Sequence, residues 1–358
     1  MLEPREALWR LAAGESLSRE EAEALFDKLI EGEVSEPMKA ALLVALRVKG
    51  EAVHEIAGAA ASMRRHAIPI RHKCQGVVDT CGTGGDGRGT FNISTAAALV
   101  AAAAGVRIAK HGNRSISSRS GSADVLAALG LKIEIDPETA ARALEAVGLT
   151  FLFAPTLHPG MRNIMPVRRE LGMRTIFNVL GPLINPAGAV RQVMGVYADS
   201  MVELIANVLH ELGAEHALVV HGTDGLDEIT TTGPTHIGEV RDGKVSVYML
   251  DPAEIGVPRA RLEDLVGGSP EDNAVLMHRI LDGETGPLAD ITALNAGAAL
   301  YVSGLAPTLR EGYQAAVAAL ASGAAARKLA ELKQFLEGGG HRTDPTDRSD
   351  RSDRKDRP

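Results

Sequence analysis

The chain has 358 residues, 45% of them hydrophobic, and a formal net charge of −8. This is enough apolar material for a sizeable core and enough length for two domains, so a disordered protein is excluded. An acidic chain has no overall electrostatic attraction to nucleic acid or to an anionic membrane, so any phosphate must be bound by a local site. The two cysteines, Cys74 and Cys81, are too few for a disulfide framework or a zinc site and predict unpaired thiols.

The first residues are acidic and amphipathic and lack the basic start and apolar centre of a secretory signal. The longest apolar runs are short and alanine-rich, well below the ~20 residues that a membrane span needs. We therefore expect a cytoplasmic protein that binds neither membrane nor nucleic acid.

Residues 1–67 carry apolar side chains at three- and four-residue spacing, which is typical of amphipathic helices, for example over 20–30 and 37–48. Ser18 followed by Glu21 fits a capping box at the start of one helix. Because no strand pattern occurs here, this part of the sequence predicts a small all-helical lobe.

From Gly76 onward, short Val- and Ile-rich runs alternate with helical segments. This alternation predicts a mainly parallel sheet with crossover helices. The expected strands lie at 77–80, 106–110, 150–154, 190–198 and 216–222, and a hairpin turns at 241–243. A helix over 201–212 and a mostly helical last third from 270 to 337 complete the pattern.

The predicted fold class is α/β, with a small all-helical lobe beside a larger α/β lobe that has a mainly parallel central sheet. A helical insert at about 159–185 is expected to join residues 1–70 in the helical lobe. The α/β lobe then comprises 71–158 and about 186–340. Residues 341–358 mix both charges with Ser and Pro and contain no aliphatic side chain, so they predict a disordered tail.

The first segment that could bind a ligand is DTCGTGGDG at 79–87, which follows a predicted strand. Its glycines can adopt positive φ and bring backbone N–H groups close to an anion. Residues 91–95 (FNIST) then open an alanine-rich helix whose N-terminal amides favour phosphate. A flexible loop with Ser94 as an ordinary N-cap is the alternative for either half, but the combination favours an anion site. The pattern matches neither a Walker A loop nor a dinucleotide fingerprint, which disfavours standard nucleotide folds.

The second segment, KHGNRSISSRSG at 110–121, lies at the carboxyl end of the next predicted strand, where ligands of open α/β sheets bind. Lys110, Arg114 and Arg119 offer charge, and the serines offer hydroxyls, for an anion such as pyrophosphate. A solvated basic turn is the alternative for the segment. For His111, a hydrogen-bonded structural role is an equal alternative.

Three arginines at helical spacing, Arg162, Arg168 and Arg169, occur in the helical insert. A planar guanidinium can pair with a substrate carboxylate through two hydrogen bonds. Surface ion pairs with Glu170 and its neighbours are the alternative, and the residues alone do not choose one arginine over another.

The last segment, HGTDGLDE at 221–228, follows a strand and ends in the adjacent carboxylates Asp227 and Glu228. Hard oxygen ligands of this kind hold Mg²⁺ together with water and substrate phosphates. An isolated Asp-Glu pair is more often exposed surface, so the prediction depends on the neighbouring motifs.

Together these motifs, with NVLGPLINP from Asn178 and Ser120-Gly121 with Asp124, resemble those of the anthranilate phosphoribosyltransferase family from about residue 5 to 337. The resemblance implies that the phosphoribosyl group of 5-phosphoribosyl 1-pyrophosphate is transferred to the amine of anthranilate. The products would be N-(5-phosphoribosyl)anthranilate and pyrophosphate, in tryptophan biosynthesis. It also implies a homodimer formed through the helical lobe.

The resemblance implies a role for each matching residue. The phosphoribosyl pyrophosphate site would be lined by Gly82, Gly85, Asp86, Thr90, Asn92, Ile93, Ser94, Thr95, Lys110, His111, Gly112, Asn113, Arg114, Ser115, Ile116, Ser117, Ser118 and Ser122. Mg²⁺ would be bound by Ser94, Asp227 and Glu228, and anthranilate would be contacted by Gly82, Asn113 and Arg168. No residue is assigned as a general base, because an aromatic amine is already largely unprotonated at neutral pH; His111 is a candidate for positioning.

Two alternatives remain at this point. A pyrimidine-nucleoside phosphorylase resembles this family in fold, but its Ser-Gly-Arg-Gly-type loop is not found here, and a paired magnesium motif would have less purpose there. A relative that binds nucleic acid through a basic face is disfavoured by the net charge and by Asp227 and Glu228.

Overall fold

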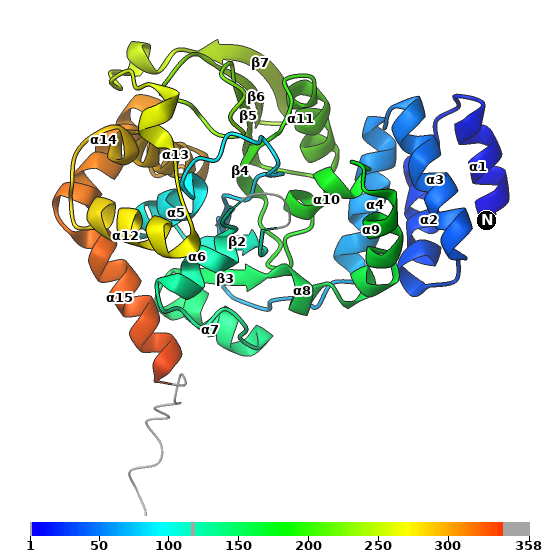
Figure 1. The fold of residues 1–358 in the computed structure, drawn as a ribbon, viewed down its shortest axis with the longest axis horizontal. Coiled ribbons are helices and arrows are strands. Elements are labelled where there is room, and N and C mark those ends of the chain that lie inside the picture. Colours follow the sequence, from blue (N-terminus) through cyan, green and yellow to red (C-terminus); the bar gives the residue numbers. More distant parts are fainter. Residues whose placement is uncertain (1, 116–118, 339–358) are drawn as a thin grey trace, which may run out of the picture.

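The structure is a computed structural model that describes residues 2–115 and 119–338, so the predicted tail at 341–358 lies outside the described residues. A group of helices at the N-terminal side lies next to a larger α/β body (Figure 1). The predicted fold class is confirmed. Within these described ranges, no helix is long and apolar enough to cross a membrane.

The N-terminal group contains α1 (Pro4–Ala12), α2 (Arg19–Glu31), α3 (Glu36–Lys49) and α4 (Val53–Arg65). The predicted capping box is present at α2, where the Ser18 side chain accepts from the Glu21 N–H and the Glu21 carboxylate accepts from the Ser18 N–H. Gly32 ends the same helix in the left-handed conformation. The amphipathic pattern buries one side of these helices, including Phe26 and Leu42.

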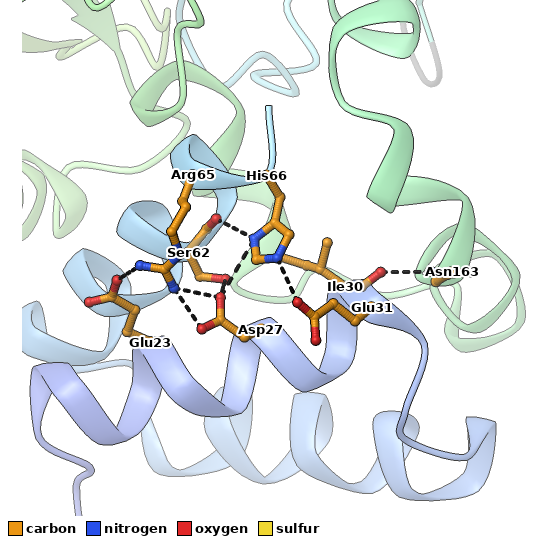
Figure 2. Close-up of polar contacts among 8 residues, drawn as sticks. All are labelled: Glu23, Asp27, Ile30, Glu31, Ser62, Arg65, His66 and Asn163. Carbon is orange, nitrogen blue, oxygen red and sulfur yellow. Dashed lines mark hydrogen bonds and ion pairs between the residues drawn. The ribbon is translucent and has the colours of Figure 1, made fainter. Parts of the chain in front are cut away.

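Residues 154–183 form α8 (Ala154–Leu157), η1 (Pro159–Asn163), α9 (Met165–Leu171) and α10 (Phe177–Leu183). This segment packs on the N-terminal helices, and the rings of Phe26 and Phe177 lie 5.7 Å apart. Asn163 donates to the Ile30 carbonyl at 2.6 Å (Figure 2), and Lys39 donates to the Asn163 carbonyl at 2.7 Å. Side-chain donors and backbone carbonyls thus supplement the apolar contact.

The central sheet has seven strands in the order β3-β2-β1-β4-β5-β6-β7. Their bounds are β1 (Val78–Asp79), β2 (Ile108–Gly112), β3 (Leu149–Phe153), β4 (Arg191–Gly195), β5 (His216–Gly222), β6 (Thr235–Arg241) and β7 (Lys244–Leu250). The first five strands are parallel, and β6 and β7 add an antiparallel edge. The hairpin predicted around 241–243 is present: Arg241 pairs with Lys244, so Asp242 and Gly243 form a two-residue turn with positive φ at both positions.

Helices cover both faces of the sheet (Figure 1). The remaining helices are α5 (Ile93–Ala103), α6 (Ser122–Ala128), α7 (Pro137–Ala146), α11 (Met201–Glu211), η2 (Pro252–Ile255), η3 (Leu262–Leu265), α12 (Pro270–Leu281), α13 (Pro287–Ser303), α14 (Leu309–Ala321) and α15 (Ala324–Glu337). Helices α5 and α13 are alanine-rich and buried almost throughout, so they fill the core of the α/β body. On the other side, α11 and strand residues such as Val219 share one apolar cluster with the N-terminal helices. The helical group is therefore fused to the sheet by a continuous core.

Polar side chains join α2 and α4 at the surface of the helical group (Figure 2). Arg65 lies 2.6 Å from Asp27 and also pairs with Glu23. The next residue, His66, has its Nδ1 2.9 Å from the Ser62 carbonyl and its Nε2 3.0 Å from a Glu31 carboxylate oxygen. Because both ring nitrogens face acceptors, only the imidazolium form donates to both.

Burial lowers the pKa of His66, but the hydrogen bonds to Ser62 and Glu31 and the charge of Asp27 outweigh it, so the pKa is raised. A raised folded-state pKa stabilises the fold fully below the unfolded value of about 6.5, and this stabilisation is lost as the pH rises through the folded pKa. We expect His66→Gln to lower the free energy of unfolding by about 0.5–1 kcal/mol at pH 6 and by less at pH 8. Urea denaturation at both pH values measures this difference, and an equal loss at both would contradict it. Glu31→Gln should remove part of the same pH dependence.

Candidate active site

The glycine-rich segment, the basic segment and the acidic segment converge at one edge of the sheet. They follow β1, β2 and β5, whose carboxyl ends point the same way because β1, β2, β4 and β5 are parallel. The Thr83 N–H donates to the Gly195 carbonyl at 2.9 Å, and an added Cβ at Gly195 would clash with the Asp227 backbone. The segments after β1 and β5 therefore meet at the end of β4, at a position where only glycine fits.

Lys110 lies at the centre of this edge and is 4% exposed. Its Nζ donates to the Thr80 carbonyl at 2.9 Å and lies 3.3 Å from the Ser94 Oγ. Burial raises the pKa values of Asp79 and Glu228, and the Lys110 charge is close enough to oppose both shifts. A buried ammonium held by Thr80 and Ser94 presents a fixed positive charge beside the glycine-rich segment.

The acidic groups Asp86, Asp227 and Glu228 gather at the same edge. The pKa of Asp227 is raised by burial and then by the charge of Asp86, and the pKa of Glu228 is raised by burial and then by the charge of Asp227. The Ser94 N–H donates to Glu228 at 3.1 Å, so one amide of the predicted phosphate-binding helix end holds a carboxylate.

This donor set suits Mg²⁺, because burial and mutual repulsion oppose the charged form of these carboxylates and a bound divalent cation would relieve both costs. Over the described ranges, no group of three or more His, Cys, Asp or Glu side chains is arranged to hold a metal ion by itself. The remaining ligands must therefore come from water and substrate phosphates, as is usual for Mg²⁺.

Helix α5 begins at Ile93 with Asn92 as its N-cap residue, so the alternative of Ser94 as N-cap is wrong. The Asn92 side chain instead donates to the Ser120 carbonyl at 3.1 Å and accepts from Asn273 at 2.9 Å. The side chains of Ile93 and Thr95 are buried, which leaves their backbone groups for any ligand contact.

One positive charge of the basic segment, that of Arg114, is neutralised by a neighbouring carboxylate. Arg114 pairs with Asp124 at 3.2 Å, and the Asp124 carboxylate also accepts from the N–H groups of Ser115 and Gly121. The Ser122 hydroxyl donates to the Asn113 carbonyl at 3.3 Å. Among the other residues predicted to line the phosphoribosyl pyrophosphate site, Gly85 is exposed and Gly112 ends β2. Three more are partly exposed: Gly82, Asp86 and Thr90. The last three lie outside the described residues: Ile116, Ser117 and Ser118.

His111 is buried, and its ring is paired with a second histidine, which the sequence motifs do not indicate. Its Nδ1 lies 3.0 Å from the Gly181 carbonyl, and its Nε2 lies 3.2 Å from the Nε2 of His158. Burial lowers the pKa of His111 to about 4 and that of His158 to about 3. Both rings are therefore neutral at physiological pH. Because both ring nitrogens of His111 already have partners within the protein, the structure favours the hydrogen-bonded structural role for this residue.

Of the three arginines at helical spacing in the insert, Arg162 and Arg169 are exposed and Arg168 is half-buried. The Arg168 Cζ lies 5.6 Å from the centre of the Phe177 ring, and burial lowers the pKa of this guanidinium. Among the residues described, none of the three forms an ion pair, so the predicted alternative of pairing with Glu170 is not observed. A half-buried guanidinium without a carboxylate partner suits an anionic ligand.

The chain combines a helical group with an α/β body, and it carries a glycine-rich loop suited to phosphate and an acidic pair suited to Mg²⁺. This combination is typical of a class of enzymes that transfer sugar groups. Two family models match the chain, "Glycosyl transferase family, helical bundle domain" over residues 5–67 and "Glycosyl transferase family, a/b domain" over residues 74–326.

More specifically, the chain belongs to the family of anthranilate phosphoribosyltransferases. It is 54% identical to the enzyme of that name from Rubrobacter xylanophilus, with 93% of this chain and 96% of the relative aligned. The crystal structure of the Thermus thermophilus enzyme is similar with a TM-score of 0.88 and 50% identity, over 92% of this chain and 99% of that one. The Saccharomyces cerevisiae enzyme, in complex with PRPP and Mg, matches with a TM-score of 0.85 and 26% identity, over 94% of this chain and 98% of that one.

Proposed function

We propose that the chain transfers the phosphoribosyl group of 5-phosphoribosyl 1-pyrophosphate to the amine of anthranilate and releases pyrophosphate. The observation that carries this proposal is the meeting of the glycine-rich loop, Lys110 and the Asp227-Glu228 pair at one edge of the sheet. Membership of the family supports the same reaction, a step of tryptophan biosynthesis. A cytoplasmic location is part of the proposal. Its cofactor is Mg²⁺, which the yeast relative binds together with PRPP.

We assign the pyrophosphate end of the substrate to the glycine-rich loop and the start of α5. Breaking the bond between C1 and the pyrophosphate oxygen builds positive charge on the sugar and negative charge on the leaving group. Lys110 is a fixed charge, and the loop amides are additional donors, that would stabilise the leaving group as it departs. Asp227 and Glu228 would hold Mg²⁺, which neutralises pyrophosphate charge when bound.

The acceptor is proposed to bind on the side of the helical insert. Arg168 would pair with the anthranilate carboxylate, Gly82 and Asn113 would contact the same ligand, and His111 would serve only to position it. The anthranilate nitrogen forms the new bond to C1 and then loses a proton, so positioning supplies most of the rate enhancement. No strong base is needed for this step.

We propose that each of the two predicted domains binds one of the two substrates. Residues 1–70 with about 159–185 form the anthranilate side, and 71–158 with about 186–340 form the side of phosphoribosyl pyrophosphate and Mg²⁺. The two family models, which match over 5–67 and 74–326, divide the chain at nearly the same place.

The reaction is tested by following the decay of anthranilate fluorescence with purified protein, phosphoribosyl pyrophosphate and Mg²⁺. Decay should require all three additions. If well-folded protein gives no decay, the anthranilate assignment is wrong, and phosphorolysis of pyrimidine nucleosides becomes the next reaction to measure.

Arg168→Ala should raise the KM for anthranilate by about 10- to 100-fold, because a hydrogen-bonded charged pair contributes about 1.5–3 kcal/mol. The KM for phosphoribosyl pyrophosphate should change little. Arg169→Ala is the matched control, since it removes an exposed arginine from the next position of the same helix. Equal effects of the two variants would contradict the assignment of Arg168.

We also propose a homodimer that uses helices α1 and α3. Trp9 on α1 and Val48 on α3 are 74% and 79% exposed, and large apolar side chains on neighbouring helices favour burial against a partner. Trp9→Asp should convert the dimer to a monomer in light scattering. Trp9 is the sole tryptophan of the chain, so its fluorescence emission should shift to the red when wild-type dimers are diluted. A wild-type monomer at all concentrations would contradict this proposal.

A further inference from the structure

The glycine-rich loop between β1 and α5 has few contacts with the rest of the protein. Gly84, Gly85, Gly87 and Gly89 have positive φ, and a Cβ added at Gly84, Gly87 or Gly89 would meet nothing within 4 Å. An exposed backbone of this kind has little packing to hold it in one conformation. Backbone hydrogen bonds anchor its two ends, where the Thr83 N–H donates to the Gly195 carbonyl and the Gly89 carbonyl accepts from the Gly267 N–H. The position of residues 84–88 between these anchors therefore depends on the few side chains that reach them.

Arg174 is one of these side chains, and it comes from the helical insert. Its Nη2 donates to the Gly85 carbonyl at 2.7 Å, and its Cζ lies 4.1 Å from the centre of the Tyr197 ring. The same ring belongs to the segment after β4, where the Tyr197 N–H donates to the Thr83 hydroxyl at 3.1 Å. Arg174 and Tyr197 thus contact the loop at two nearby points.

Tyr197 lies where three parts of the chain meet. Burial raises its pKa, and Arg47 at the end of α3, Glu51 and Arg174 are the charges close enough to affect it. A half-buried ring between these elements is a fixed platform for a stacked guanidinium. Arg174 can then direct a hydrogen bond at Gly85 at little cost in side-chain entropy, which a lysine cannot do because its ammonium is not planar.

We infer that Arg174 is a positioning residue that holds the glycine-rich loop from the segment carrying Arg168 and so links the two substrate sites. The inference rests on the proposed function, because it takes the loop as the pyrophosphate site and Arg168 as the anthranilate site. A ligand that orders the insert orders Arg174, and an ordered Arg174 holds the loop in its binding conformation. By linkage, each ligand then increases the affinity of the protein for the other by the same factor.

Calorimetry with pyrophosphate and Mg²⁺, with and without saturating anthranilate, measures this link. These ligands cannot react because no ribose phosphate is present. In the wild-type protein, anthranilate should tighten pyrophosphate binding about 5-fold or more. Arg174→Gln should weaken pyrophosphate binding and bring the ratio of the two affinities close to 1. A wild-type ratio of 1, or an unchanged ratio in Arg174→Gln, would overturn the inference.

Further variants separate positioning from charge. Arg174→Lys keeps the charge but loses the stacked geometry, so it should behave like Arg174→Gln, whereas full recovery of the link by lysine would overturn the role of geometry. Tyr197→Phe keeps the ring and should retain the link, and Tyr197→Leu should lose it. In turnover, Arg174→Gln should raise the KM for phosphoribosyl pyrophosphate while kcat at saturation changes less. If the wild-type protein binds both ligands but shows no turnover, the proposed reaction is wrong. The calorimetric ratio still decides whether the two binding sites are linked.

Discussion

Glu228→Gln and Asp227→Asn should each lower the rate of phosphoribosyl transfer by about 10²- to 10³-fold, the usual cost of removing a group that stabilises transition-state charge. The two carboxylates are the groups proposed to hold Mg²⁺, and burial, followed by the charge of the neighbouring carboxylates, raises their pKa values. The Mg²⁺ concentration that gives half-maximal rate should rise in both variants, and removal of Mg²⁺ from the wild-type protein should abolish the reaction.

The fold should not lose stability in these variants. A carboxylate whose folded-state pKa is raised destabilises the folded protein at neutral pH, so replacing it by a neutral amide should leave the melting temperature unchanged or higher. Glutamine at 228 can still accept the Ser94 N–H. Exposed Glu134 provides the matched control as Glu134→Gln. A large loss of both activity and stability would contradict a direct role in metal binding.

Lys110→Met should lower kcat/KM by about 10²- to 10³-fold, because it removes the fixed cation proposed to stabilise departing pyrophosphate. It should also destabilise the protein, since the Lys110 charge is buried near Asp79 and Glu228 and its loss leaves them without a counter-charge. Steady-state kinetics and urea denaturation separate the two effects.

Exposed Lys132 is the control for this variant, and Lys132→Met should change neither quantity. Saturating phosphoribosyl pyrophosphate should not restore the rate of Lys110→Met, because a charge that acts on the leaving group affects kcat as well as binding. If the rate of Lys110→Met recovers fully at high substrate concentration, Lys110 contributes only to substrate binding and not to the chemical step.

Local patterns in the sequence are sufficient for most of the fold. The capping box of Ser18 and Glu21, the turn at Asp242-Gly243 and the alternation of strands and helices all follow from the sequence and are present in the structure. Each depends on residues within a few positions of one another. The convergence of the three motifs also follows from the sequence, since parallel strands place their carboxyl ends at one edge.

Other features depend on residues far apart in the chain, and only the tertiary structure decides them. His158 meets His111, Arg114 is occupied by Asp124, and Glu228 accepts from the amide of Ser94. The continuous core that fuses the N-terminal helices to α11 and the sheet likewise has no local signature.

The sequence by itself thus determined the elements, their order and the edge at which ligands bind, because periodicity, glycine spacing and strand direction are local properties. The tertiary structure decided which side chains face one another across that edge. It distinguished the half-buried Arg168 from its exposed neighbours and brought Arg174 to Gly85. Such choices depend on burial and on distances between segments, and no short stretch of sequence encodes either one.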